Sequence, residues 1–396
     1  MAAHVANPGD ALLAPYRSLV ANEWQKLWVK KRWVLVIGLA ILVVGGSLLA
    51  NQTRLAAARA TGSEMAFLRQ AVAQTAQQLH NPDLSHKQRL LLRQNLAQEQ
   101  QALAQLRANP TGEVNVAQDL KSQQALLAHL PPQESPDQVR LAVAQDRYLL
   151  AHGIRSYSNF GDSGWQLPGI VLGGAGLLLL GFLVVLAVSD LVTAERQDGT
   201  LPVLFLNAAN RRGILAAKMT VAVAVTWGAL LTAVAGWWVM GGLVMGFGSP
   251  WMPQAVNVVY APYAPAGGTL AVASRHWMLL PQYAYDAWGL ALAALALGAW
   301  ASLVTAFSTL FRSAGLTTVL ASLVLLSGLF ASLLHGHPAI VADPTVSLSL
   351  LADWTGATAL STGVTQLTLW AGIAVWLGWL LVAWGFSLWR FERLEP

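Results

Sequence analysis

The sequence contains no cysteine and has few charged residues for its length. Without cysteine the chain cannot form disulfides, bind a metal through thiolates or use a cysteine nucleophile. Only 11% of its 396 residues are charged, whereas soluble chains carry about 25% charged residues. Since 55% of the residues are hydrophobic and 17 are tryptophan, the composition excludes an ordinary soluble domain and indicates a polytopic membrane protein.

Motifs for nucleotide binding and catalysis are also missing. The chain has no Gly-x-x-x-x-Gly-Lys-Ser/Thr phosphate loop, so we do not expect it to bind ATP by itself. An intramembrane enzyme is disfavoured, because no Ser/His/Asp, Glu/His or paired-Asp arrangement falls within the apolar runs. The single close histidine pair, in His335-Gly336-His337, lacks a third ligand at metal-binding spacing, so we interpret it as part of a loop and not as a metal site. Mid-membrane charges, which ion-coupled transporters require, are nearly absent.

Six apolar runs are long enough to cross a hydrocarbon layer of about 30 Å. We predict spans at residues 33–50, 168–188, 219–244, 287–311, 314–334 and 367–389. The predicted fold is therefore all-α: a polytopic membrane protein with six transmembrane helices and an inserted extracytoplasmic helical domain. Two pairs of glycines four residues apart, Gly169 with Gly173 and Gly242 with Gly246, indicate close helix packing more than a specific dimer contact.

The basic residues next to the spans predict the orientation of the chain. They precede the first span, lie between the second and third and between the fourth and fifth, and follow the sixth. By the positive-inside rule these segments and both termini are cytoplasmic, so we expect a multi-pass protein of the cell membrane. A cleaved signal peptide ending near Ala50 is the competing interpretation, but the polar leader and the apolar run are both long for one.

The soluble parts divide into a leader and one inserted domain. Residues 1–32 have apolar and basic positions at helical spacing and predict a cytoplasmic interfacial elbow helix, with Arg17, Glu23 and Lys26 on a wet or phosphate-facing side. Residues 51–166 carry two leucine-rich stripes, which predict an extracytoplasmic helical hairpin, followed by shorter helices at 116–129 and 136–152. Residues 167–396 hold the other five spans and a cytoplasmic loop at 190–218.

The segment between the second and third spans carries the strongest functional signal. From Ser189 to Lys218 it reads SDLVTAERQDGTLPVLFLNAANRRGILAAK. An acidic residue is followed by an Asp-Gly-Thr turn, a short apolar run at 201–206 and a basic ending. An ordinary positive-inside loop is the alternative interpretation. A short amphipathic helix parallel to the membrane, however, could transmit a force from a soluble subunit to the second and third spans together.

This order of residues resembles the coupling loop of type-2 ABC exporter permeases. The resemblance implies that the loop contacts an ATPase partner through Glu195, Gly199, Thr200, Arg211, Arg212 and Lys218. Within the loop we expect Glu195 to pair with Arg211 or Arg212. No catalytic, cofactor-binding or metal-binding residue is expected in this chain, and it is not expected to be an enzyme.

The resemblance also implies the partners. ATP and Mg would be bound by a separate cytoplasmic ABC ATPase, and a second permease subunit, identical or different, would complete the membrane part. Membrane lipids are expected to surround it, and no nucleic acid is expected. The implied function is ATP-driven export of a lipid-like, peptide or glycan substrate. The alternative is a non-transporting membrane sensor or scaffold, whose outer helical domain is driven by a partner ATPase.

Overall fold

The computed structural model describes residues 8–29, 38, 45–46, 61–79, 96, 113–132, 134–158, 163–207, 211–266, 268–273, 275–331 and 336–393. These residues form two compact units. Unit 1 comprises the described residues of Met1–Ser47, Leu130–Leu141 and Ser163–Pro396, and unit 2 comprises those of Leu48–His129 and Ala142–Asp162.

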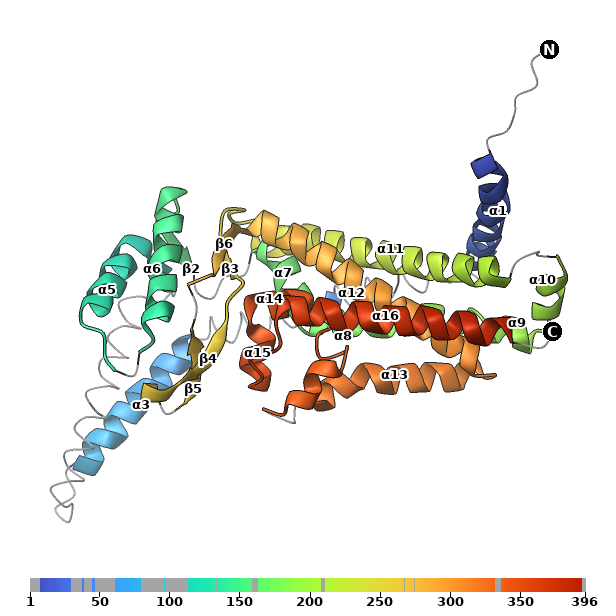
Figure 1. The fold of residues 1–396 in the computed structure, drawn as a ribbon. Coiled ribbons are helices and arrows are strands. Elements are labelled where there is room, and N and C mark those ends of the chain that lie inside the picture. The colour runs from blue at the N-terminus through green and yellow to red at the C-terminus, as the bar shows by residue number, and fades with distance from the viewer. Residues whose placement is uncertain are drawn as a thin grey trace. The chain divides into compact units, whose positions relative to one another are not determined.

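Unit 1 is a helical bundle (Figure 1). Its long helices are α8 (Ala175–Val188), α11 (Arg211–Met245), α12 (Gln282–Leu310), α13 (Ala314–Ala331) and α16 (Leu369–Glu392). In the described part of the chain, five helices are long and apolar enough to cross a membrane, which confirms an all-α polytopic architecture. The predicted first span at 33–50 lies outside the described residues, apart from Gly38, Gly45 and Gly46.

Helix α12 lies at the centre of the bundle, because it packs against α8, α11, α13 and α16. Its buried face is rich in alanine, and the indole of Trp300 is fully buried there and donates a hydrogen bond to the carbonyl of Gly181 over 3.1 Å. The buried hydroxyls of Ser302 and Thr305 each donate to a carbonyl four residues earlier in the same helix. These two hydroxyls are thus satisfied within their own helix, as a non-aqueous environment favours.

The second predicted span, at 168–188, contains a helix that can cross a membrane, but the helix is interrupted near its start. Helix α7 (Gln166–Leu172) ends two residues before α8 begins, and Gly174 between them has φ −140° and ψ −147°. Such a break is stable in the bundle only if the freed carbonyls find donors. The hydroxyl of Ser349 supplies one of them, donating to the carbonyl of Leu172 over 2.7 Å.

The third span begins earlier than predicted. Helix α11 starts at Arg211 and has 35 residues. At about 1.5 Å per residue it is about 52 Å long, well beyond the hydrocarbon thickness of about 30 Å. Arg211, Arg212 and Lys218 therefore belong to the first turns of a helix and not to the loop before it.

The segment between α11 and α12 contains strands that the sequence did not predict. Strand β3 (Pro253–Val256) pairs antiparallel with β6 (Met278–Pro281), and β4 (Tyr260–Tyr263) pairs antiparallel with β5 (Thr269–Val272), with the short helix η1 (Ala264–Ala266) between the last two. Proline is tolerated in these strands because both ladders have only two strands, so every strand is an edge. The segment between α13 and α16 holds η2 (Pro338–Ala342), α14 (Leu350–Thr355) and α15 (Ala357–Thr362).

Unit 2 is mainly helical, with α3 (Thr61–Leu79) and α5 (Val116–Ala128) close to their predicted positions. Helix α6 (Pro136–Ala151) also lies close to its predicted range of 136–152. Its first residues are grouped with unit 1 and the rest with unit 2, although the whole helix was expected within the outer domain. Strands β1 (Glu113–Asn115) and β2 (Ser156–Ser158) pair antiparallel and were not predicted. The second helix of the predicted hairpin lies outside the described residues except for Leu96, which is helical.

Candidate functional site

The loop between the second and third spans folds into two short helices. Helix α9 (Thr193–Gln197) and helix α10 (Leu201–Asn207) are separated by the turn Asp198-Gly199-Thr200. Gly199 has φ +66°, in a region that disfavours side chains, and the amide of Thr200 donates to the carbonyl of Glu195 over 3.0 Å. The predicted turn and short apolar helix are both present.

A compact ion network joins this loop to the N-terminal helix and to the third span. The network consists of Glu23 and Lys26 from α1 (Pro8–Val29), Glu195 from α9 and Lys218 from α11. The Nζ atom of Lys218 lies 2.9 Å from Glu23 Oε2 and 2.8 Å from Glu195 Oε1. The Nζ atom of Lys26 lies 2.7 Å from Glu23 Oε1 and 2.6 Å from Glu195 Oε1. Each cation therefore contacts both anions, and the four charges sum to zero.

Burial makes this network energetically important. The side chains of Lys218 and Glu23 are 0% and 5% exposed, and Lys218 also donates to the carbonyl of Leu191 over 3.1 Å. Burial alone would lower the pKa of Lys26, but its hydrogen bonds to Glu195 and Glu23 outweigh that effect and raise the pKa above its usual value. A buried charge is tolerated only when paired, so loss of any one member leaves an uncompensated ion.

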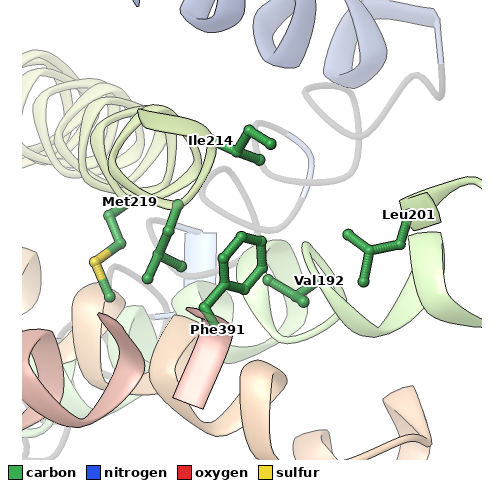
Figure 2. Close-up of a cluster of buried hydrophobic side chains, with 6 residues drawn as sticks. Val192, Leu201, Ile214, Met219 and Phe391 are labelled. Atoms are coloured by element: carbon green, nitrogen blue, oxygen red, sulfur yellow. The ribbon is translucent and has the colours of Figure 1, made fainter. Parts of the chain in front are cut away.

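A cluster of buried apolar side chains forms a second attachment of the loop to the bundle (Figure 2). Its buried members converge from the loop, from α11 and from α16: Val192, Leu201, Ile214, Leu215, Met219 and Phe391. Partly buried side chains pack against them, including Leu19 of α1 and Leu204 and Phe205 of α10. Each fully buried side chain of this size contributes about 1.5–3 kcal/mol relative to an exposed one. Helix α10 is therefore firmly attached to the bundle.

The expected pairing of Glu195 with Arg211 or Arg212 is wrong. Arg211 donates to the backbone carbonyl of Glu392 over 2.9 Å, and Arg212 forms an ion pair with the carboxylate of Glu392. The two arginines occupy the first turn of α11, whereas Lys218 lies about two turns further along the helix and reaches Glu195. Basic residues that are close in sequence therefore anchor two different parts of the structure.

Two arginines bind the loop to the ends of other helices. The guanidinium of Arg211 lies 4.4 Å from the ring centroid of Phe205, in addition to its bond to α16. Arg196 of α9 donates to the carbonyls of Thr309 and Phe311 over 3.3 and 3.2 Å, at the C-terminal end of α12. Carbonyls at a helix end lack partners within the helix, so a basic side chain there is favourable.

Sequence reasoning placed Glu23 and Lys26 on a wet side of the elbow helix and missed their role in the network. Glu23 is instead one of the most buried charged residues of the described chain. The spacing of Glu23 and Lys26, three residues apart on one face of a helix, was the available signal. No comparable signal marked Arg196 or Glu392, because their partners are backbone carbonyls or residues far away in sequence.

The side of the loop that faces away from the helical bundle is exposed and partly apolar. The side chains of Val203 and Leu206 on α10 are 56% and 84% exposed, and residues 197–200 are exposed beside them. We call Val203, Leu206 and residues 197–200 the coupling surface. Exposed apolar side chains grouped on one short helix are typical of a contact with another protein.

A family model described as "ABC-2 family transporter protein" matches residues 17–395. The chain belongs to this family. No curated protein and no solved structure matches it. As an ABC-2 permease it is the membrane component of an ABC transporter and not the ATP-binding subunit, and the family implies a partner ATPase.

In this permease, the side chain of His337 caps a short helix. Its Nδ1 accepts a hydrogen bond from the amide of Ala339 over 3.2 Å and so caps the short helix η2. Over the ranges that the structure describes, no group of three His, Asp or Glu side chains is placed to hold a metal ion.

Proposed function

We propose that this permease is half of the membrane part of an ATP-driven exporter and that its coupling surface binds the cytoplasmic ATPase. The observation that carries the proposal is the double attachment of α9 and α10, through the buried ion network and through the apolar cluster. An exposed loop of ordinary positive-inside character has no need for either attachment. A loop that transmits force needs both.

The attachments define two routes by which a push on the coupling surface reaches the spans. Through the ion network, Glu195 moves together with Lys218 of α11 and with α1. Through the apolar cluster, Leu201 and Phe205 move together with Phe391 of α16, and the rings of Phe205 and Phe391 meet edge to face at 5.3 Å. When the partner ATPase binds ATP with Mg and closes, the third and sixth spans are displaced together.

The exposed apolar faces of the spans favour contacts with a second permease subunit and with membrane lipids. In the apolar, membrane-crossing stretch of each helix, only 22% is buried in α13 and 22% in α16, whereas 72% is buried in α12. Large apolar side chains on these helices, such as Leu323 and Leu381, are 56% and 74% exposed. Surfaces of this kind are stable only against lipid or another apolar protein face. The substrate class proposed is lipid-like, peptide or glycan.

Substitution at Leu206 tests the docking. Leu206→Asp places a charge on the coupling surface but touches nothing in the bundle, since the side chain is 84% exposed. We expect this variant to fold and insert, to recover much less ATPase on co-purification, and to lose transport. Leu206→Met, which keeps the apolar surface, is the matched control and should behave as the wild type. Full ATPase recovery with Leu206→Asp would refute the docking role.

The competing function is a sensor or scaffold that transmits a signal without moving a substrate. Vesicles containing the complex distinguish the two functions. An exporter accumulates substrate inside inverted vesicles when ATP is added to the medium outside them, and that substrate stimulates ATP hydrolysis. A sensor hydrolyses ATP without accumulation of any of the three substrate classes, and Leu206→Asp would then abolish only the signal.

A further inference from the structure

A groove lies between the N-terminal helix α1 and the first third of α11. It has a volume of about 570 Å³, and the residues that line it are Tyr16, Arg17, Val20, Ala21, Trp24, Gln25 and Thr220. The hydroxyl oxygens of Tyr16 and Thr220 are 2.7 Å apart and join the two helices at the groove. A volume in the range of about 300–1,000 Å³ is typical of small-ligand sites.

The groove occupies a different face of α1 from the ion network. Arg17, Val20, Ala21 and Trp24 follow the three- and four-residue spacing of a single helical stripe. Glu23 and Lys26 point instead toward Glu195 and Lys218. The function proposed above for the coupling loop does not use the groove.

The position of the groove along α11 indicates a depth near the membrane surface. Thr220 is the tenth residue of a helix of 35 residues. A helix about 52 Å long extends about 20 Å beyond a hydrocarbon core of about 30 Å. The part of α11 that lines the groove therefore falls near the boundary between headgroups and acyl chains, where an amphipathic helix with tryptophan and basic residues typically lies.

The lining is chemically asymmetric. Val20, Ala21 and Trp24 provide an apolar wall, and the indole of Trp24 is 42% exposed. Arg17 is exposed and contributes a positive charge, and none of the lining residues is acidic. An apolar wall beside one unopposed cation matches a ligand with an acyl chain and an anionic headgroup.

We propose that the groove between α1 and α11 binds an anionic phospholipid of the inner leaflet. Arg17 binds the phosphate, and an acyl chain lies along Val20, Ala21 and Trp24. Because the same helix carries Glu23 and Lys26, a bound lipid contacts the element that holds the coupling loop. The binding itself requires no ATPase, so its test is independent of the proposed transport function.

Native mass spectrometry of the purified full-length chain tests the proposal, with phosphatidylglycerol and phosphatidylcholine as probes. We expect the wild type to retain phosphatidylglycerol preferentially. One basic residue near an anionic surface accounts for about a five-fold preference, so Arg17→Gln should lose about that factor for phosphatidylglycerol and little for phosphatidylcholine. Arg393→Gln, which removes another exposed arginine beyond the last span, is the matched control and should retain the preference. Equal losses in the two variants would overturn the proposal.

Two further variants at Ala21 test whether lipid enters the groove. Ala21→Trp fills the groove and should reduce the retention of both lipids, while its melting temperature shows whether the chain still folds. Ala21→Cys introduces a single thiol into a chain without cysteine. A membrane-soluble maleimide should label this thiol, and added phosphatidylglycerol should slow the labelling. Absence of labelling in the folded protein would show that another protein segment covers the groove, and the lipid proposal would fail.

Discussion

Replacement of Lys218 by methionine is the most direct test of the ion network. The ammonium group of Lys218 is fully buried and lies within 2.9 Å of two carboxylates. Its removal leaves Glu23 and Glu195 with Lys26 alone, so a cluster of zero net charge becomes a buried cluster of net charge −1. Removal of one partner from a buried ion pair typically costs about 3–5 kcal/mol, and we expect a loss of that order.

A second substitution separates the charge effect from the loss of packing. The double variant Lys218→Met with Glu195→Gln restores zero net charge and keeps the pair of Glu23 and Lys26, whose atoms are 2.7 Å apart. We expect it to be clearly more stable than Lys218→Met alone. Glu195→Gln alone leaves an excess cation, but Lys26 is 37% exposed and water reaches it, so a smaller loss is expected. Burial makes even this loss larger than the 0–1 kcal/mol expected of an exposed pair.

The assay is thermal unfolding of the purified permease in detergent, followed by tryptophan fluorescence, together with substrate transported per ATP hydrolysed in the reconstituted complex. Lys218→Met should lower the melting temperature and reduce the transport ratio more than the rate of ATP hydrolysis. The double variant should recover part of both. If Lys218→Met melts like the wild type, or if the double variant melts no higher than the single one, the network does not hold α1, α9 and α11 together.

Three further predictions concern the turn, unit 2 and the orientation. Gly199→Ala should weaken transport and cost about 1–2 kcal/mol, because Gly199 has φ +66° and alanine disfavours it, whereas Gly199→Asn should cost less in the same melting assay. Burial, and then the charge of Asp119, raise the pKa of Asp146 from 3.8 to about 6. The contribution of this carboxyl to the stability of unit 2 is therefore present in full below pH 3.8 and is lost as the pH rises through about 6. Asp146→Asn should increase the free energy of unfolding at pH 7 by about 1–2 kcal/mol, seen as a higher melting temperature, and have little effect at pH 3.5. A cysteine at Ala151 should react with an impermeant maleimide in intact cells, and one at Leu206 only after permeabilisation; labelling of both in intact cells would contradict the orientation.

Elements that bury one continuous stripe were predictable from the sequence. Helix α1, helix α10 and the spans of α12, α13 and α16 lie close to their predicted ranges, because the apolar periodicity of a helix is a local property. The break at Gly174 was not predictable in the same way. Its stability depends on the hydroxyl of Ser349, which lies 177 residues away from Leu172 in sequence.

The ion network in the functional site likewise could not be predicted from local sequence patterns. Glu195 and Lys218 were identified as important, but their partners were not, because the contacts depend on how three separate helices approach one another. Arg211 and Arg212, at the basic end of the same loop sequence, were natural candidates for Glu195. Helix α11 begins at Arg211, however, and this places them at the end of α16 instead.

The combination of a charged network and an apolar cluster has a physical reason. Apolar contacts are non-directional, so a helix held only by them can slide with little loss of free energy. Buried ions do not permit such sliding, because a shift of one helical turn, about 5.4 Å, would separate Lys218 from both of its carboxylates in a non-aqueous environment. Well-packed apolar residues would stabilise the junction equally well, so stability alone does not explain the four charges. The need for a fixed register explains them, because a push on α10 displaces α11 and α1 only if the contacts between these helices cannot slip.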